Sequence, residues 1–200
     1  MSVELPDAET LYHHFLAGWI SPDDPRDRLL RSDLEQIELQ PGQHIRMITP
    51  LNQEGQKLMK DQLQRTTQAA LADFPAMLQV EGPPSVAWLK RLEEHVTPER
   101  LQGWLRMSNP EKPDNPWFVL CCETAAVIAE VLKKEWPRLQ WLPDTPYFES
   151  DLFDLNAKVR IPVFHWATRA LSGDETNPLE EKIDATLEFL RNPSGESPRL

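Results

Sequence analysis

Residues 116–136, PWFVLCCETAAVIAEVLKKEW, form the longest apolar stretch of this 200-residue chain. Asn115 is a typical helix N-cap, and Pro116 suits the first helical position, so the pattern predicts a helix that runs to Trp136. The segment is apolar on nearly every side through Val131. Because a helix that is apolar all round is normally buried, we expect this segment to be the central helix of the fold.

After this helix, short stretches of alternating apolar and polar residues predict strands. They are RLQWL (138–142), FESDLFD (148–154) and KVRIPV (158–163), with a turn at 155–156. Pro162 lacks a backbone N–H, so the third strand should end there or lie at a sheet edge. Two further helices are predicted, over 164–171 with Gly173 as its stop and over about 178–190.

The sequence before residue 108 is predicted to be mainly helical, with amphipathic segments that follow capping residues. These segments begin at Asp7, Asn52, Ser85 and Thr97. The first should extend through Trp19, and Pro75 should end the second. Residues 33–48 alternate around a Pro-Gly pair, which predicts a β-hairpin, with an irregular connection as the alternative.

Together these elements predict a single α+β domain over residues 1–191. A small antiparallel sheet in the C-terminal half should pack on the buried central helix. The helical part covers 1–107, a proline-rich connector covers 108–116, and the α/β part covers 117–191. Residues 192–200 have no apolar periodicity and are predicted to be a disordered tail.

The net charge of −11 limits the kinds of partner that this chain can bind. Such a charge repels phosphate backbones and anionic membrane surfaces, so we expect neither nucleic-acid nor membrane binding, whereas a basic protein partner would be attracted. No stretch is long and apolar enough to predict a membrane span, and the first residues lack the pattern of a signal peptide. Cys121 and Cys122 are adjacent and cannot easily bridge each other, which fits a cytoplasmic protein.

Motifs that would indicate a cofactor or metal are not found in the sequence, so we expect neither. The chain has no glycine-rich phosphate loop and no cysteine or histidine pattern at zinc spacing. Glu9 and His13 are four residues apart, but a metal needs more ligands than this one pair. Cys122 is a weak nucleophile candidate, because its apolar flanks and its position inside the helix predict a buried thiol.

The segment 145–171, TPYFESDLFDLNAKVRIPVFHWATRAL, holds the candidate site residues. In a strand, Glu149 and Asp151 would share one face about 7 Å apart, and with His165 they could perform acid–base chemistry. They could equally lie on the wet outer face of a packed hairpin. Aromatic side chains among the carboxylates also suggest a docking patch for a basic partner. That patch would consist of Tyr147, Phe148, Glu149, Asp151 and Asp154.

The order of elements from Asn115 to Ser172, a helix, strands and a helix, resembles that of small bacterial α+β domains. Some of these small bacterial domains serve as toxin-immunity or adaptor proteins. The lack of a catalytic motif, together with the aromatic and acidic residues of the candidate patch, predicts a non-enzymatic, protein-binding role of adaptor or immunity type. Two alternatives stay open. One is a hydrolase or transferase that uses His165 with nearby carboxylates or a cysteine. The other is a small-ligand sensor with an aromatic-lined pocket. The oligomeric state is left open.

Overall fold

The structure is a computed structural model, and it describes residues 4–20, 35–36, 51–144, 146–174 and 177–192. Its centre is the helix α5, Pro116–Glu135, which begins where the Asn115 side chain accepts a hydrogen bond from the Phe118 N–H. Ala125, Val127 and Ile128 of this helix have no exposed surface. The expected buried central helix is therefore confirmed.

The sheet lies in the C-terminal half, as predicted, and is antiparallel. Its strands are β2 (Gln140–Leu142), β3 (Asp151–Asp154) and β4 (Val159–Ile161), and a two-residue strand, β1 (Glu35–Gln36), adds to β4. Leu152 stands opposite Ile161, and both side chains are fully buried in the same core as α5. The α+β fold class is therefore confirmed, with one short strand contributed from the N-terminal half.

All three predicted strands are shorter than expected, and β2 begins only at Gln140. Residues 147–149 form a turn of 3₁₀ helix, η2 (Tyr147–Glu149), in which the Glu149 N–H donates to the Pro146 carbonyl at 2.9 Å. The third strand ends at Ile161, because Pro162 has no N–H to continue the ladder. The helix α6 (Val163–Ala170) starts directly after it, so Val163 belongs to a helix and not to the strand.

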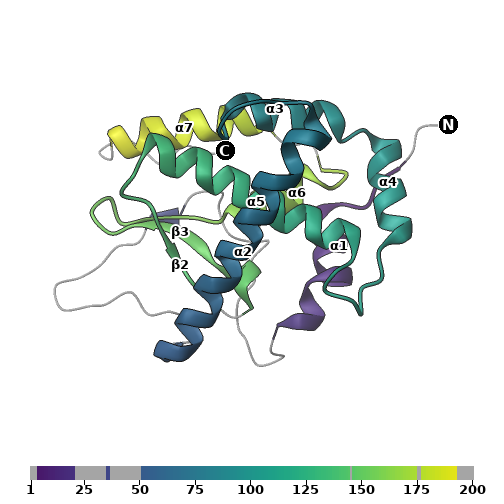
Figure 1. Cartoon of the computed structure of the whole chain (residues 1–200), viewed down its shortest axis with the longest axis horizontal. Coiled ribbons are helices and arrows are strands. Elements are labelled where there is room, and N and C mark those ends of the chain that lie inside the picture. Colours follow the sequence, from purple (N-terminus) through teal and green to yellow (C-terminus); the bar gives the residue numbers. More distant parts are fainter. Residues whose placement is uncertain (1–3, 21–34, 37–50, 145, 175–176, 193–200) are drawn as a thin grey trace.

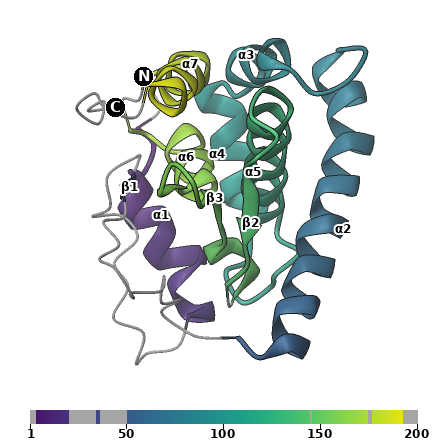
Figure 2. The same ribbon diagram turned by 90° about the vertical axis from the view of Figure 1, so that its left-hand side faces the viewer.

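The remaining helices surround α5 and α6, with α3 and α7 together at one end (Figure 1). They are α1 (Ala8–Phe15), α2 (Gln53–Leu78), α3 (Val86–His95), α4 (Pro98–Met107) and α7 (Leu179–Arg191). The helix α1 packs against α6, whereas α2 packs against α5, so these two flank the central pair from opposite sides (Figure 2). The N-terminal half is thus helical, as predicted.

Two helix ends differ from the prediction. The helix α2 passes through Pro75 and ends only after Leu78, because Phe74 and Leu78 are buried and hold its last turn against the core. This packing offsets the backbone hydrogen bond that proline cannot make. The helix α1 stops at Phe15, and Trp19 follows in a short 3₁₀ turn, η1 (Ala17–Trp19), with 40% of its surface exposed.

Parts of the predicted organisation lie outside the described residues. The hairpin expected over 33–48 falls there except for β1, and so does the tail from residue 193 onward. Among the helices that the structure describes, none is both long enough and apolar enough to cross a membrane.

The contact between α2 and α5 half-buries the carboxyl of Glu123, which has a predictable pH effect. Burial, and then the nearby carboxylate of Asp73, raise the pKa of Glu123 to about 7. The folded state therefore binds this proton more tightly than the unfolded state does. The contribution of Glu123 to the free energy of unfolding should therefore fall as the pH rises from about 4.5 to about 7, and stay level above that range.

Glu123→Gln is expected to stabilise the protein at pH 8 by about 1 kcal/mol, a value reduced for the solvent exposure of this half-buried group. At pH 4 the variant and the wild type should unfold at the same urea concentration. The matched control is Glu130→Gln on the same helix, which loses an ion pair to Lys133 (2.7 Å) and should stabilise at neither pH. A Glu123→Gln gain that is equal at both pH values would contradict this assignment.

Candidate functional site

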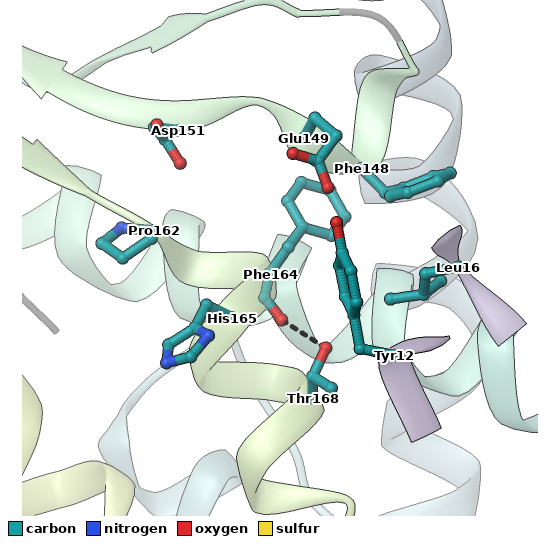
Figure 3. A pocket seen from close by; sticks show the side chains of 9 residues that line it. All are labelled: Tyr12, Leu16, Phe148, Glu149, Asp151, Pro162, Phe164, His165 and Thr168. Atoms are coloured by element: carbon teal, nitrogen blue, oxygen red, sulfur yellow. Dashed lines mark hydrogen bonds between the residues drawn. The ribbon is translucent and has the colours of Figure 1, made fainter. Parts of the chain in front are cut away.

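A small cavity of about 20 Å³ lies where α1, η2, β3 and α6 meet. Its polar lining consists of Tyr12, Glu149, Asp151, His165 and Thr168 (Figure 3). The rest of the wall is formed by Leu16, Phe148, Pro162 and Phe164. All nine lining residues are buried. The two carboxylates and the histidine singled out by the sequence therefore line the same cavity.

Local backbone geometry brings these side chains inward. The η2 turn follows Pro146, and the Ser150 hydroxyl then accepts a hydrogen bond from the Asp144 N–H at 2.9 Å. This turn places Glu149 outside the strand β3. Glu149 and Asp151 therefore do not lie on one face of a strand, as the sequence had suggested. His165 lies in the first turn of α6, whose start is set by Pro162.

The expected wet face of this segment is not found. Glu149, Asp151 and Asp154 are at most 3% exposed, Phe148 is 6% exposed, and Tyr147 is half-buried. An acidic docking patch requires carboxylates at the surface, and these lie in the interior. The segment 147–154 is therefore part of the core, which corrects the idea of a patch at these residues.

An ion pair inside the protein balances the charge of Asp151. Arg160 of β4 donates to the Asp151 carboxylate, and their side chains are 12% and 3% exposed. Arg160 stands opposite Phe153, so Asp151 is two positions away along the same face of β3. The pair therefore joins the two central strands next to the cavity.

Asp154 has a structural role at the other end of β3. It accepts hydrogen bonds from the Trp136 indole N–H (2.5 Å) and from the backbone N–H groups of Asn156 and Ala157. Burial alone would raise the pKa of Asp154, but these donors, together with Arg138, lower it below the usual value. Asp154 thus ties the β3–β4 turn to the end of α5 and does not reach the cavity.

The cysteines are part of the core and not of the cavity. Burial raises the pKa of Cys122 to about 12, although a hydrogen bond from the Tyr147 hydroxyl partly counteracts it. Tyr147 in turn accepts hydrogen bonds from Thr66 and Gln62 of α2. Burial likewise raises the pKa of Cys121 well above its ordinary value. Cys122 therefore contacts Tyr147 and does not line the cavity with His165. Both cysteines are buried, as the sequence predicts.

His165 also lines a second, open depression of about 270 Å³ at the surface, between the start of α1 and the end of α6. The other lining residues are Asp7, Ala8, Glu9, Arg169 and Asp174. Arg169 and Asp174 form an ion pair at 3.7 Å. His165 is only 9% exposed and lines both this depression and the cavity described above.

A close backbone contact holds the two sides of the depression together. The Gly173 N–H donates to the Pro6 carbonyl at 2.7 Å, and a Cβ at Gly173 would lie 2.5 Å from the Leu5 carbonyl oxygen. Only glycine therefore fits at this crossing. The sequence suggested Gly173 as a helix stop and Asp7 as a cap, but contained no signal that Gly173 packs against the residues just before α1.

Neither the cavity nor the depression forms a metal site in the described part of the chain, where no group of three or more histidine, cysteine or acidic side chains could hold an ion. Comparisons with protein-family models, with curated proteins and with solved structures found no match to the chain. The function is therefore argued from the site itself.

Proposed function

We propose that this protein is a non-enzymatic binding domain, of adaptor or immunity type, that accepts a basic side chain of a protein partner in the depression between α1 and α6. The observation that carries the proposal is the lining of this depression. It contains three carboxylates, of Asp7, Glu9 and Asp174, and only one guanidinium, that of Arg169, which pairs with Asp174.

Electrostatics favour a cationic group at this position. The side chain and the backbone N–H of Thr10 donate to Asp7, which lowers the pKa of its carboxyl and keeps it ionised. The depression thus has an excess of negative charge within a chain whose net charge is −11. Such a field raises the association rate of a basic partner. The volume of about 270 Å³ suits one long side chain better than a whole cofactor.

The buried groups favour binding over chemistry. Neither cysteine is a thiolate nucleophile at neutral pH, because burial raises the pKa of both thiols. The cavity that holds Glu149 and Asp151 has a volume of about 20 Å³, which is far below the few hundred Å³ of a ligand pocket. A small-ligand sensor with an aromatic-lined pocket is disfavoured for the same reason.

The proposal is tested with a fluorescent oligoarginine peptide and the charge-reversal variant Glu9→Lys/Asp174→Lys. Wild-type protein should bind the peptide at low salt, and the variant should bind about tenfold more weakly, or worse, since two attractions at the rim become repulsions. The matched control is Glu81→Lys/Glu99→Lys, which changes the net charge equally at exposed positions outside the depression. It should retain most of the binding.

Two results would contradict the proposal. One is a wild type that does not bind the peptide at all. The other is equal weakening by both double variants, because that would assign the binding to net charge and not to this depression.

Acid–base catalysis is the second candidate function. It is favoured by one observation, the convergence of His165, Glu149 and Asp151 on a single cavity. A substrate would have to react from the depression, with His165 as the group between it and the carboxylates. Hydrolysis of a model ester or phosphate that is abolished by His165→Asn, in a variant that still folds, would favour this function over simple binding.

A further inference from the structure

We infer that Arg169 is a built-in competitor in the depression between α1 and α6, which a partner's basic side chain must displace from the carboxylate of Asp174. This inference rests on the proposed function and adds how the same site limits its own affinity. The observation that carries it is the ion pair between Arg169 and Asp174, because one carboxylate of the depression already holds a guanidinium of this chain.

Local structure places Arg169 and Asp174 together. Arg169 lies in the last turn of α6, and its carbonyl accepts a hydrogen bond from the Ser172 hydroxyl at 2.8 Å. The Ser172 hydroxyl oxygen in turn accepts a hydrogen bond from the Asp174 N–H at 3.1 Å. The Gly173 N–H joins this loop to the Pro6 carbonyl. The backbone therefore holds the Asp174 carboxylate beside the end of α6, within reach of Arg169.

The ion pair between Arg169 and Asp174 is weak enough for a ligand to open. The Arg169 Nε atom lies 3.7 Å from the Asp174 Oδ2 atom, which is longer than a hydrogen bond, and the two side chains are 30% and 27% exposed. Partly exposed ion pairs without ideal geometry contribute little to stability. A guanidinium of a partner can therefore take the place of Arg169 at the Asp174 carboxylate.

Competition by Arg169 should weaken binding without abolishing it. A site that is open for only part of the time binds its ligand more weakly by that fraction, and an exposed ion pair of this kind lowers the affinity by up to about fivefold. Asp7 and Glu9 carry the remaining negative charge of the depression, so the wild-type site still attracts a basic side chain.

The test uses the fluorescent oligoarginine peptide and the variant Arg169→Gln. At low salt this variant should bind the peptide about fivefold more tightly than the wild type does. The matched control is Arg106→Gln, which changes the net charge equally at an exposed position of α4 outside the depression. It should change the affinity by less than about twofold. Arg169→Lys restores the positive charge and should return the affinity toward that of the wild type.

A double-mutant cycle separates competition at Asp174 from a general charge effect. In an Asp174→Asn background Arg169 has no carboxylate at this position to occupy. Arg169→Gln should then tighten peptide binding by less than about twofold. An effect of net charge alone, or a role of Arg169 only in ending α6, would not depend on Asp174 in this way.

The outcomes distinguish the inference from the proposed function. If the wild type binds the peptide and Arg169→Gln binds no more tightly, or gains as much in the Asp174→Asn background, the inference is wrong and the proposed function stands. If neither protein binds, both fail. Binding by Arg169→Gln alone would support the inference and contradict the proposed function of the wild type. Urea unfolding shows whether the variants fold, and Arg169→Met, which keeps the aliphatic stem, replaces an Arg169→Gln protein that does not.

Discussion

Arg160→Met is expected to destabilise the protein by about 3–5 kcal/mol, because removing one partner of a buried ion pair leaves the other charge in the interior. The Asp151 side chain is 3% exposed and extends from β3 to the wall of the cavity. Solvent cannot compensate there for the lost guanidinium. Urea unfolding followed by tryptophan fluorescence measures the change.

Two further variants separate burial from charge. Arg91→Met removes an ion pair with Glu94 whose side chains are 62% and 52% exposed, and should cost at most about 1 kcal/mol. The double variant Asp151→Leu/Arg160→Met replaces both charges by apolar groups and should recover at least half of the loss. If Arg160→Met costs no more than Arg91→Met, the Asp151–Arg160 pair is not a buried one.

Trp117→Ala should also cost about 3–5 kcal/mol, since it removes a large, fully buried side chain and leaves a cavity. Trp117 joins three elements. It belongs to α5, and the centre of its ring lies 4.9 Å from the ring centre of Phe15 in α1. Its indole N–H donates to the carbonyl of Leu171, just after α6, at 2.9 Å. The loss should therefore loosen both sides of the depression, and peptide binding should weaken together with stability.

The matched control is Trp19→Ala, which truncates a tryptophan that is 40% exposed and should cost less than about 1 kcal/mol. Trp117→Phe keeps most of the ring volume but loses the hydrogen bond to Leu171, so its cost should fall between the other two. A Trp117→Ala protein as stable as Trp19→Ala would show that α5 does not hold α1 and α6 together in this way.

The secondary structure could be predicted well where its causes are local. Thr97 and Asn115 cap their helices through hydrogen bonds to the residue three positions ahead, and such caps are visible in sequence. Pro162 ended β4 as predicted, for a purely covalent reason. Pro75 shows the limit of this approach, because the buried Phe74 and Leu78 carry α2 past it.

The candidate site could be predicted only in part. Glu149, Asp151 and His165 were named from their residue types, but their burial was not foreseen. Apolar–polar alternation in FESDLFD indicated a solvent-facing side, whereas the η2 turn and the Arg160 pair place both carboxylates inside. The depression was missed altogether, because Asp7 and Glu9 reach His165 only after α1 packs on α6.

The sequence by itself determined the buried central helix, the α+β class and most helix starts, because these follow from apolar periodicity and from caps within a few residues. Only the tertiary structure decided which charged groups are buried and which meet. Those properties depend on contacts between distant segments, such as Gly173 against Leu5 and Tyr12 beside Glu149. No local pattern records such contacts, since their energy comes from packing and desolvation after the elements have come together.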